Sequence, residues 1–295
     1  MNINDLHLFL AATESGSLAQ AARRLNITPM AASRRLAALE QELGRRLIQR
    51  TTRSLSLTQE GAEFIPYART ITEAEESAKA LFLPEATGAG GLLRITAPSG
   101  LGRRHILPLI PDLLSANPEM RIDLQLSDEV VDIVGSGIDI AVRVAPLRDS
   151  TLIARKIADN PRVLCASPHY LARCGTPQSV SDLAHHNCLR LSSVLQWSFE
   201  KQGEIESVSV EGRFSASNVD GIRALCVQGL GLAQLAWWDV KDEIAQGLLQ
   251  EVVLAGVSPQ RLSIWGVLPT VRYLPRRVTL FIAALKAAFT EPDNR

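Results

Sequence analysis

The 295-residue sequence has few cysteines, and their spacing matches no common metal or redox motif. The four are Cys165, Cys174, Cys188 and Cys226, and no two form a Cys-x-x-Cys pair. His185 and His186 precede Cys188, but adjacent histidines in a loop are usually solvated, and no Cys/His array has zinc spacing. We therefore expect neither a metal site nor a cofactor.

Long apolar runs are absent as well. No stretch reaches about 18 consecutive apolar residues, the length that a membrane-spanning helix needs. Residues 1–17 contain no lysine or arginine, so they lack the basic region of a signal peptide. With 46% hydrophobic and 21% charged residues, the chain can bury a sizeable core. We expect a cytoplasmic protein of two or three domains.

The formal net charge is zero, but charge is unevenly distributed along the chain. Residues 1–58 contain eight arginines and four acidic residues, a net charge of +4. Residues 59–88 contain six glutamates, one arginine and one lysine, a net charge of −4. A basic block followed by an acidic segment indicates that the two have different partners.

The stretch Ser17–Glu40, SLAQAARRLNITPMAASRRLAALE, predicts two short helices joined by a tight turn. Ser17 and Gln20 have the spacing of a capping box at the start of the first helix. Asn26 suits a left-handed position at its end. Thr28-Pro29 restarts the chain, with threonine as the N-cap and proline at the first helical position, where its missing N–H costs nothing.

Apolar spacing indicates which faces of these helices are buried. An earlier helix, Asp5–Glu14, is expected to bury Leu6, Phe9, Leu10 and Thr13. The next should bury Leu18, Ala21, Ala22 and Leu25. The third should bury Ala32, Leu36 and Leu39, and expose Met30, Ser33, Arg34 and Ala37. A thin, basic outer face suits a DNA major groove, because the arginine fork matches guanine edges and phosphates.

A winged hairpin is predicted after the helix pair. Arg45–Ile48 and Ser54–Leu57 have the pattern of two short strands, and Arg50–Arg53 forms a basic tip between them. Arg53 is placed to reach a minor groove or a flanking phosphate. Together these features predict a winged helix-turn-helix that binds DNA. The alternative is a solvated, amphipathic helical hairpin.

The segment Leu6–Gly61 closely resembles the N-terminal domain of LysR-type transcriptional regulators. The matching motifs are Gly-Ser-x-x-x-Ala-Ala-x-x-Leu, Ser-Arg at 33–34, Leu-Glu-x-Glu-Leu-Gly at 39–44 and Leu-Thr-x-x-Gly at 57–61. The resemblance implies that Thr28, Met30, Ser33 and Arg34 contact DNA and that Arg53 acts in the wing. Many members have glutamine or serine where this chain has Pro29 and Met30, and methionine offers only apolar contact, for instance to a thymine methyl group.

One long helix is predicted for Thr58–Leu83, with Thr58 as its N-cap. Its apolar stripe consists of Ala62, Ile65, Ala68, Ile71, Ala78, Leu81 and Phe82. We expect the same helix of a second chain to cover this stripe; the alternative cover is the chain's own C-terminal domain. A two-fold pair of recognition helices would read an interrupted inverted repeat. In the resemblance this segment is the dimerising linker, and Thr87–Gly91 then reads as a hinge.

Strand and helix patterns alternate after residue 91, which predicts an α/β domain with a parallel sheet. Strands are expected at Leu92–Ala97, Arg121–Leu126, Ile138–Val144, Arg162–Ala166, Leu189–Leu191, Val208–Val210, Gly231–Leu235 and Arg261–Val267. Helices are expected at Leu101–Ala116, Val130–Gly135, Pro168–Ala172, Val219–Gln228, Val240–Gln246 and Arg276–Phe289. The layout is that of a two-lobed, type 2 periplasmic-binding-protein-like domain.

The expected domains are a DNA-binding domain (1–58), a linker (59–91) and an effector-binding domain (92–295). Lobe one would comprise 92–161 and 266–295, and lobe two 162–265. Residues 93–98, 137–143, 165–172 and 229–233 resemble the LysR co-inducer-binding domain. Because open α/β sheets bind ligands at the carboxyl ends of their strands, the pocket candidates are Ser99, Gly100, Asp128, Val144 and Asn218. Each of them also suits a cap or turn. Asp128 would disfavour an anion unless it is neutralised.

The leading hypothesis is a ligand-responsive transcription regulator that acts as a homodimer or homotetramer. The resemblance implies double-stranded DNA, a small-molecule effector and RNA polymerase as partners. An enzyme with a DNA-binding domain is an alternative, but no phosphate-binding loop, dinucleotide motif or nucleophile elbow occurs. A transport-type binding protein is another. Redox sensing through Cys188, in the sequence HHNCLR, is a further alternative, because it resembles one LysR branch.

Overall fold

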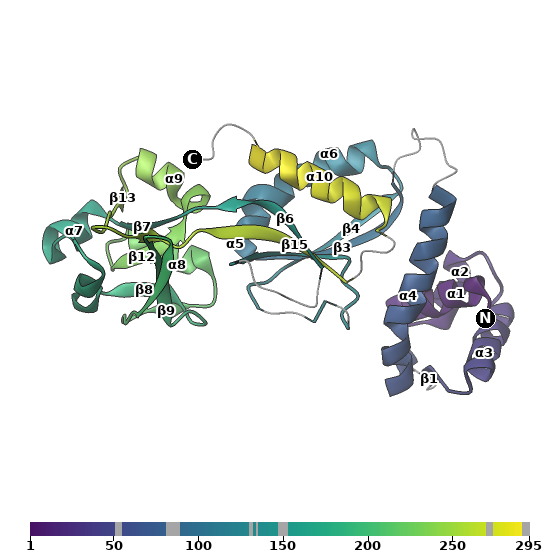
Figure 1. The fold of residues 1–295 in the computed structure, drawn as a ribbon. Helices are drawn as coiled ribbons and strands as arrows, with labels where there is room; N and C mark the ends of the chain where they lie inside the picture. The colour runs from purple at the N-terminus through teal and green to yellow at the C-terminus, as the bar shows by residue number, and fades with distance from the viewer. Residues whose placement is uncertain are drawn as a thin grey trace.

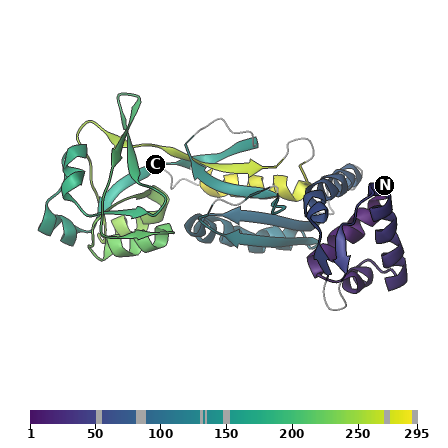
Figure 2. The same cartoon turned by 90° about the horizontal axis from the view of Figure 1, so that it is seen from below.

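The computed structural model describes residues 1–50, 55–80, 89–129, 132–133, 135–146, 153–269 and 274–290. A helical N-terminal unit, a long helix and two sheet-containing lobes follow one another in an elongated row (Figures 1 and 2). The predicted fold class, a winged helix-turn-helix followed by a linker helix and a two-lobed α/β domain, is confirmed. Arg53, Leu81, Phe82 and half of the predicted helix Val130–Gly135 lie outside the described residues.

The N-terminal unit consists of three helices and a two-stranded hairpin. They are α1 (Ile3–Ser15), α2 (Leu18–Arg24), α3 (Pro29–Leu43), β1 (Ile48–Arg50) and β2 (Leu55–Leu57). Helix α1 packs on α2, α3 and also α4. Its buried residues are therefore Leu6, Leu8, Phe9, Ala11 and Ala12, whereas Leu10 and Thr13 are only half-buried. The single predicted face was wrong for α1, because a third neighbour covers a second side.

The predicted helix ends are confirmed by their backbone and side-chain geometry. Asn26 has φ of 53°, the left-handed conformation expected between α2 and α3. The Ser17 hydroxyl accepts a hydrogen bond from Gln20 N at 3.4 Å, which is the first of the two bonds of a capping box. Gly44 ends α3 with φ of 66°, a conformation that favours glycine.

The linker helix α4 spans Gln59–Ala80, and Thr58 caps it by accepting a hydrogen bond from Gly61 N at 2.9 Å. Ala68 is fully buried in the core of the N-terminal unit, and Ile65 packs against the same core. The expectation that another chain or the C-terminal domain covers the whole stripe was thus wrong for these two residues, since α1 covers them. Ala62, Ile71 and Ala78 remain exposed.

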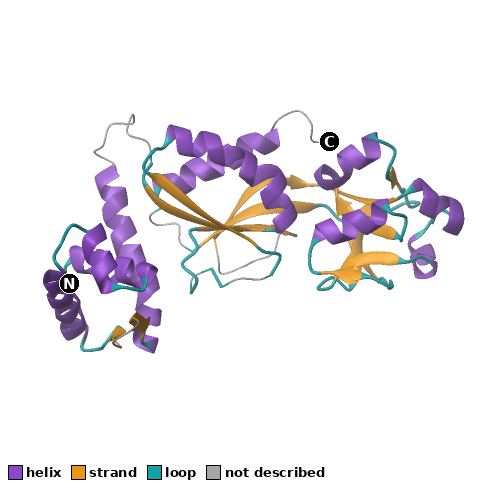
Figure 3. Ribbon diagram, turned by 180° about the vertical axis from the view of Figure 1, so that it is seen from behind, coloured by secondary structure: helices purple, strands orange, loops and turns teal. Residues whose placement is uncertain are grey.

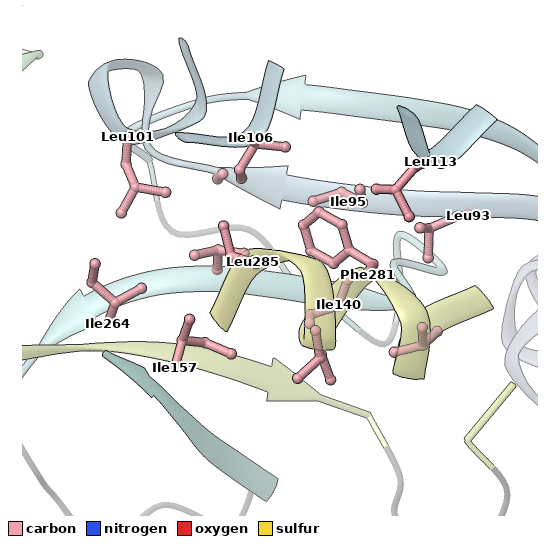
Figure 4. Packing of buried hydrophobic residues seen from close by; sticks show 14 of the residues in the cluster. Leu93, Ile95, Leu101, Ile106, Leu113, Ile140, Ile157, Ile264, Phe281 and Leu285 are labelled. Carbon is pink, nitrogen blue, oxygen red and sulfur yellow. The ribbon is translucent and has the colours of Figure 1, made fainter. Parts of the chain in front are cut away.

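Lobe one has a five-stranded sheet in the order β4-β3-β5-β15-β6. Its strands are β3 (Gly91–Ala97), β4 (Met120–Leu126), β5 (Ile140–Ala145), β6 (Ile153–Asn160) and β15 (Leu262–Leu268). Its helical segments are α5 (Ser99–Leu101), a π-helical turn (Gly102–Ile106), a 3-10 turn (Leu107–Leu109), α6 (Ile110–Ala116) and α10 (Arg276–Thr290). Ile106, Leu113 and Phe281 from these helices meet Leu93 and Ile95 of β3 in the lobe's core (Figure 4).

Lobe two has a second five-stranded sheet, in the order β11-β8-β12-β7-β13, and a three-stranded sheet, β10-β9-β14. The first contains β7 (Arg162–Ala166), β8 (Cys188–Leu191), β11 (Ser215–Ala216), β12 (Leu232–Ala236) and β13 (Gln250–Glu251). The second contains β9 (Gln196–Lys201), β10 (Glu204–Ser209) and β14 (Ser258–Pro259). The helices are α7 (Pro168–Cys174), a 3-10 helix (Val180–His185), α8 (Val219–Val227) and α9 (Trp237–Ala245), as Figure 3 shows from behind.

Two long strands connect the lobes. β6 leads directly into β7 of lobe two, and β15 returns from lobe two to pair with β5 and β6 (Figure 1). Both β15 pairings are antiparallel, and so are those of β7 with β12 and β13. The predicted all-parallel sheet is therefore corrected to mixed sheets. Strand β15 of the lobe-one sheet starts at Leu262, four residues before the expected lobe boundary at 266.

Other differences from the predicted elements have local causes. Pro108 and Pro111 divide the predicted helix Leu101–Ala116 into short segments, since proline removes a helical hydrogen bond. Strand β6 was not predicted, because its partner β15 lies far along the sequence. Strand β9 was not predicted either, because it pairs in a hairpin with the polar strand β10. Among the described residues, no helix has both the length and the apolar character to cross a membrane.

Candidate nucleic-acid interface and effector cleft

Helix α3 begins at a turn that fixes the orientation of its first residues. The Thr28 hydroxyl accepts a hydrogen bond from Ala31 N at 3.2 Å, and Pro29 occupies the first helical position. Both interactions are local, and both follow from the Thr-Pro pair in the sequence. Ala32, Leu36 and Leu39 anchor the opposite face of α3 in the core.

The outward face of α3 presents an apolar and a basic side chain at its N-terminal end. Met30 is 82% exposed, Arg34 is exposed and Ser33 is half-buried. Arg34 has no ion-pair partner among the described residues, whereas Arg35 lies 4.0 Å from Asp5 Oδ1. Arg24 pairs with Glu14 at 3.1 Å. Arg24 and Arg35 are therefore held by carboxylates, whereas Arg34, like the exposed Arg23 of α2, has no such partner among the described residues and lies on the same face of α3 as Met30.

The start of the wing is tied to α3 by one carboxylate. Glu40 Oε1 accepts hydrogen bonds from Leu47 N at 2.9 Å and Ile48 N at 3.1 Å. These bonds hold the connection 45–47 in place, so the first strand starts at Ile48 and not at Arg45 as predicted. Arg53, the expected wing residue, lies outside the described part of the chain.

Four of the five pocket candidates lie at the carboxyl ends of the adjacent strands β4, β3 and β5. Ser99 and Gly100 open the helical segment after β3, Asp128 follows β4, and Val144 is near the end of β5. The Ser127 amide donates to Ala97 O at 2.9 Å, which brings the ends of β3 and β4 together. Ser99 is half-buried, Gly100 buried, Asp128 exposed and Val144 half-buried.

The fifth candidate, Asn218, comes from lobe two. It is the N-cap of α8, and its Oδ1 accepts a hydrogen bond from Gly221 N at 3.0 Å. Helix α8 contacts α5, so Asn218 lies on the side of lobe two that faces the strand ends of lobe one. The capping role that its sequence also suited is thus present in the structure.

Sequence reasoning missed Arg143, the charged residue at the same strand ends. Its Nη2 donates to Thr96 Oγ1 at 3.2 Å, and Thr96 is fully buried. Burial lowers the pKa of Arg143, and the nearby Asp128 carboxylate acts in the opposite direction. Arg143 therefore places a positive charge near Asp128 at these strand ends. An arginine within the otherwise apolar strand sequence IAVRVA was the available signal.

Ion pairs join the two lobes close to the segment that starts at Ser99. In the π-helical turn of lobe one, Arg103 pairs with Asp220 of α8, and Arg104 Nε lies 3.5 Å from Asp239 Oδ1 of α9. Arg104 also reaches Asp242 at 3.3 Å and Glu243 at 3.8 Å. Arg103 and Arg104 directly follow the helical segment Ser99–Leu101.

Two family comparisons cover nearly the whole chain. Residues 3–62 match the bacterial regulatory helix-turn-helix protein, lysR family, and residues 86–290 match the LysR substrate binding domain. The chain belongs to the LysR family. It combines the DNA-binding and substrate-binding domains of that family, as the sequence resemblance implied.

Relatives agree with this assignment over nearly their full length. The HTH-type transcriptional regulator DmlR of Escherichia coli is 30% identical, over 98% of this chain and 95% of that protein. PtxR of Pseudomonas aeruginosa, another HTH-type transcriptional regulator, is 33% identical, over 97% and 92%. These relatives are regulators and not enzymes, so the enzyme alternative is not supported. The chain is a DNA-binding transcriptional regulator of the LysR type.

Solved structures of full-length family members have the same fold. The Vibrio cholerae virulence activator AphB aligns with a TM-score of 0.59 at 32% identity, covering 97% of this chain and 99% of that one. CrgA of Neisseria meningitidis aligns with a TM-score of 0.60 at 31% identity, covering 98% and 99%.

The cysteines of this LysR regulator do not form a reactive centre. Cys165, Cys188 and Cys226 are fully buried, and Cys174 is exposed. Burial raises the pKa of the Cys188 thiol to about 12, so almost no thiolate exists at neutral pH. This counts against the redox reading of HHNCLR.

Proposed function

We propose that this LysR regulator binds an interrupted inverted repeat in double-stranded DNA and responds to a small effector bound between its lobes. The observation that carries the DNA part is the exposed N-terminal face of α3, with Met30 and the solvent-facing Arg34. Arg34 would contact a guanine edge or a phosphate, and Met30 a thymine methyl group. Thr28 and Ser33 would bond phosphates or base edges, and Arg53 would act from the wing.

Dimerisation would pair the exposed side of α4 with its two-fold copy. Tyr67 is 68% exposed and Ile71 36% exposed, so both remain available after α1 has covered Ala68. A homodimer would present two recognition helices to successive major grooves, and a homotetramer would bridge two such sites. RNA polymerase at the regulated promoter would be a further partner, and the cytoplasm is the compartment that this function requires.

The proposed domains are the DNA-binding domain at 1–58, the linker at 59–91 and the effector-binding domain at 92–295. Lobe one would comprise 92–161 and 266–295, together with the first residues of β15, which starts at Leu262. Lobe two would lie between them.

The effector would contact Ser99, Gly100, Asp128, Val144 and Asn218, and we add Arg143 to this set. Arg143 and the amides at the start of α5 suit a carboxylate, and Asp128 suits a hydroxyl or amino group. The cleft chemistry thus favours a small organic acid with a second polar substituent. Its binding would alter the interlobe ion pairs of Arg104 and shift the spacing of the DNA-binding domains.

DNA binding can be tested by fluorescence anisotropy over a range of salt concentrations. Arg34→Ala should weaken specific binding by about 1–3 kcal/mol if Arg34 reads a base edge, or reduce the salt slope by about one if it contacts a phosphate. Arg213→Ala removes the same charge from an exposed site in lobe two and should change neither quantity. Equal affinity of wild type and Arg34→Ala at all salt concentrations would contradict the proposal.

A further inference from the structure

A cavity of about 180 Å³ lies between the DNA-binding domain and lobe one, at the end of β3 opposite the proposed effector site. Five arginines line it, contributed by α2, α4, β3, β4 and α10: Arg24, Arg69, Arg94, Arg121 and Arg277. The same lining contains a single carboxylate, that of Glu14 in α1, and the imidazole of His7. This concentration of guanidinium groups is unusual for a chain of zero formal net charge.

The Glu14 carboxylate is already shared between two of these arginines. Its Oε1 lies 2.6 Å from Arg94 Nη2, and its Oε2 lies 3.1 Å from Arg24 Nη1. Behind the cavity, Asp139 Oδ2 accepts a hydrogen bond from the Arg94 amide at 2.8 Å and lies 3.8 Å from Arg277 Nε. Arg121 is exposed and has no ion-pair partner among the described residues. The five guanidinium groups of the lining therefore face two carboxylates, Glu14 in the lining and Asp139 behind it, which leaves an excess of positive charge.

Like charges around one cavity repel each other unless an anion offsets them. The volume far exceeds the roughly 10–15 Å³ that a single water needs, so an anion of several heavy atoms fits. Arginine forks bind phosphate oxygens bidentately, and a phosphate group carries about −1.5 to −2 charges at pH 7. A monocarboxylate would offset only one charge and could engage fewer of the five forks.

We propose that this cavity is a second ligand site, distinct from the effector cleft, and that it takes a phosphate dianion, either free or as a small phosphomonoester. The two sites lie at opposite ends of β3, a strand of seven residues that is about 20 Å long. The bound phosphate joins Arg24 of the DNA-binding domain to Arg94 and Arg121 of lobe one. It therefore stabilises this arrangement of the two domains and links phosphate concentration to the placement of α3.

Isothermal titration of the full-length protein with inorganic phosphate, at constant ionic strength, tests the proposal. Glycerol 3-phosphate in a parallel titration distinguishes a phosphomonoester site from one that admits only free phosphate. We expect one saturable site per chain. Arg121→Gln should weaken phosphate binding by roughly tenfold, as expected for loss of one charge-assisted hydrogen bond. Arg155→Gln, at an exposed position in β6, should leave it unchanged.

Glu14→Gln provides a test with the opposite sign. It removes the only carboxylate of the lining, so phosphate should bind several-fold more tightly than to the wild type. If these arginines serve only to hold the two domains together, neither variant will change the titration and the wild type will show no saturable heat.

Two further results would overturn the proposal. One is phosphate binding that Arg121→Gln leaves intact. The other is a loss of DNA affinity in Arg121→Gln in phosphate-free buffer, because that would make the cavity a DNA contact. The DNA measurement also separates this site from the proposed recognition by Arg34, which can fail without affecting phosphate titration.

Discussion

Arg104 and Asp239 join the two lobes through an ion pair with one almost fully buried member. The Asp239 side chain is only 1% exposed, and Arg104 Nε lies 3.5 Å from its Oδ1. Arg223 Nη1 also reaches Asp239 Oδ1, at 3.2 Å. Burial nevertheless raises the pKa of Asp239, with the charge of Arg223 opposing the effect. The arginines therefore oppose the effect of burial on the pKa of Asp239.

Arg104→Gln should destabilise the protein, because it removes one of the two arginines around this buried carboxylate. We expect a loss of about 1–3 kcal/mol in the free energy of unfolding at pH 7. The loss is smaller than for a buried carboxylate with no counter-charge, because Arg223 remains beside Asp239. Urea denaturation measures this loss, with Arg155→Gln as the matched control. The loss should shrink on acidification, since protonated Asp239 no longer needs a counter-charge. A variant as stable as the wild type would show that the pair contributes nothing.

His105 should make stability depend on pH between about 4 and 6.5. Its ring stacks on that of Phe289, with 4.3 Å between the ring centroids. It meets the Trp238 ring edge-on, with 5.0 Å between the centroids. Burial, with a smaller effect of Lys241, lowers its pKa to about 4. The unfolded state binds the proton more readily in this range, so the stabilising contribution is complete above pH 6.5 and is lost as pH falls towards 4.

His105→Phe keeps a ring in this position without a titrating group. The stability of the wild type relative to this variant should therefore decrease steadily from pH 7 to pH 4.5 in urea titrations. Parallel stability curves for the two proteins would contradict the assigned protonation behaviour.

One thiol should react quickly in the native protein. Cys174 is the exposed cysteine. Cys188 is protected from reaction by its burial and by the raised pKa of its thiol. Ellman's reagent should detect one fast thiol in the native state and all four after denaturation. Cys174→Ser should abolish the fast reaction, and Cys188→Ser should leave it intact. The reverse pattern would revive redox sensing through Cys188.

Glu40 should couple the wing to the recognition helix. Glu40→Ala leaves the amides of Leu47 and Ile48 without their acceptor, a cost of about 1–3 kcal/mol in stability. DNA affinity should fall as well, because the wing is then held less firmly. Glu40→Gln retains an acceptor oxygen and should lose less in both thermal denaturation and DNA binding. Equal losses in the two variants would assign the effect to charge and not to these hydrogen bonds.

Interactions between residues close in sequence were predictable. The caps at Ser17 and Thr28 and the left-handed Asn26 depend on neighbours within a few positions, so the sequence pattern was sufficient for them. The buried face of α3 was predicted for the same reason, since one stripe faces one core.

Interactions between distant segments were not predictable in this way. The second buried side of α1 depends on α4, and the pairing of Arg104 with Asp239 joins residues 135 positions apart. Arg143 was missed because strand periodicity indicates burial but not which polar groups the adjacent strand ends bring together. The antiparallel return of β15 likewise depends on the whole of lobe two, which separates it from its partner strands.

Footprinting on the DNA that flanks the regulator's own gene tests the central claim most directly. We expect the wild type to protect an interrupted inverted repeat, more weakly at higher salt because phosphate contacts release counterions. Arg34→Ala should lose this protection, and Arg213→Ala should retain it. If the wild type protects this DNA no better than random DNA, with and without added small organic acids, or if Arg34→Ala protects the same repeat equally well, the assignment of α3 as the DNA-reading helix is contradicted.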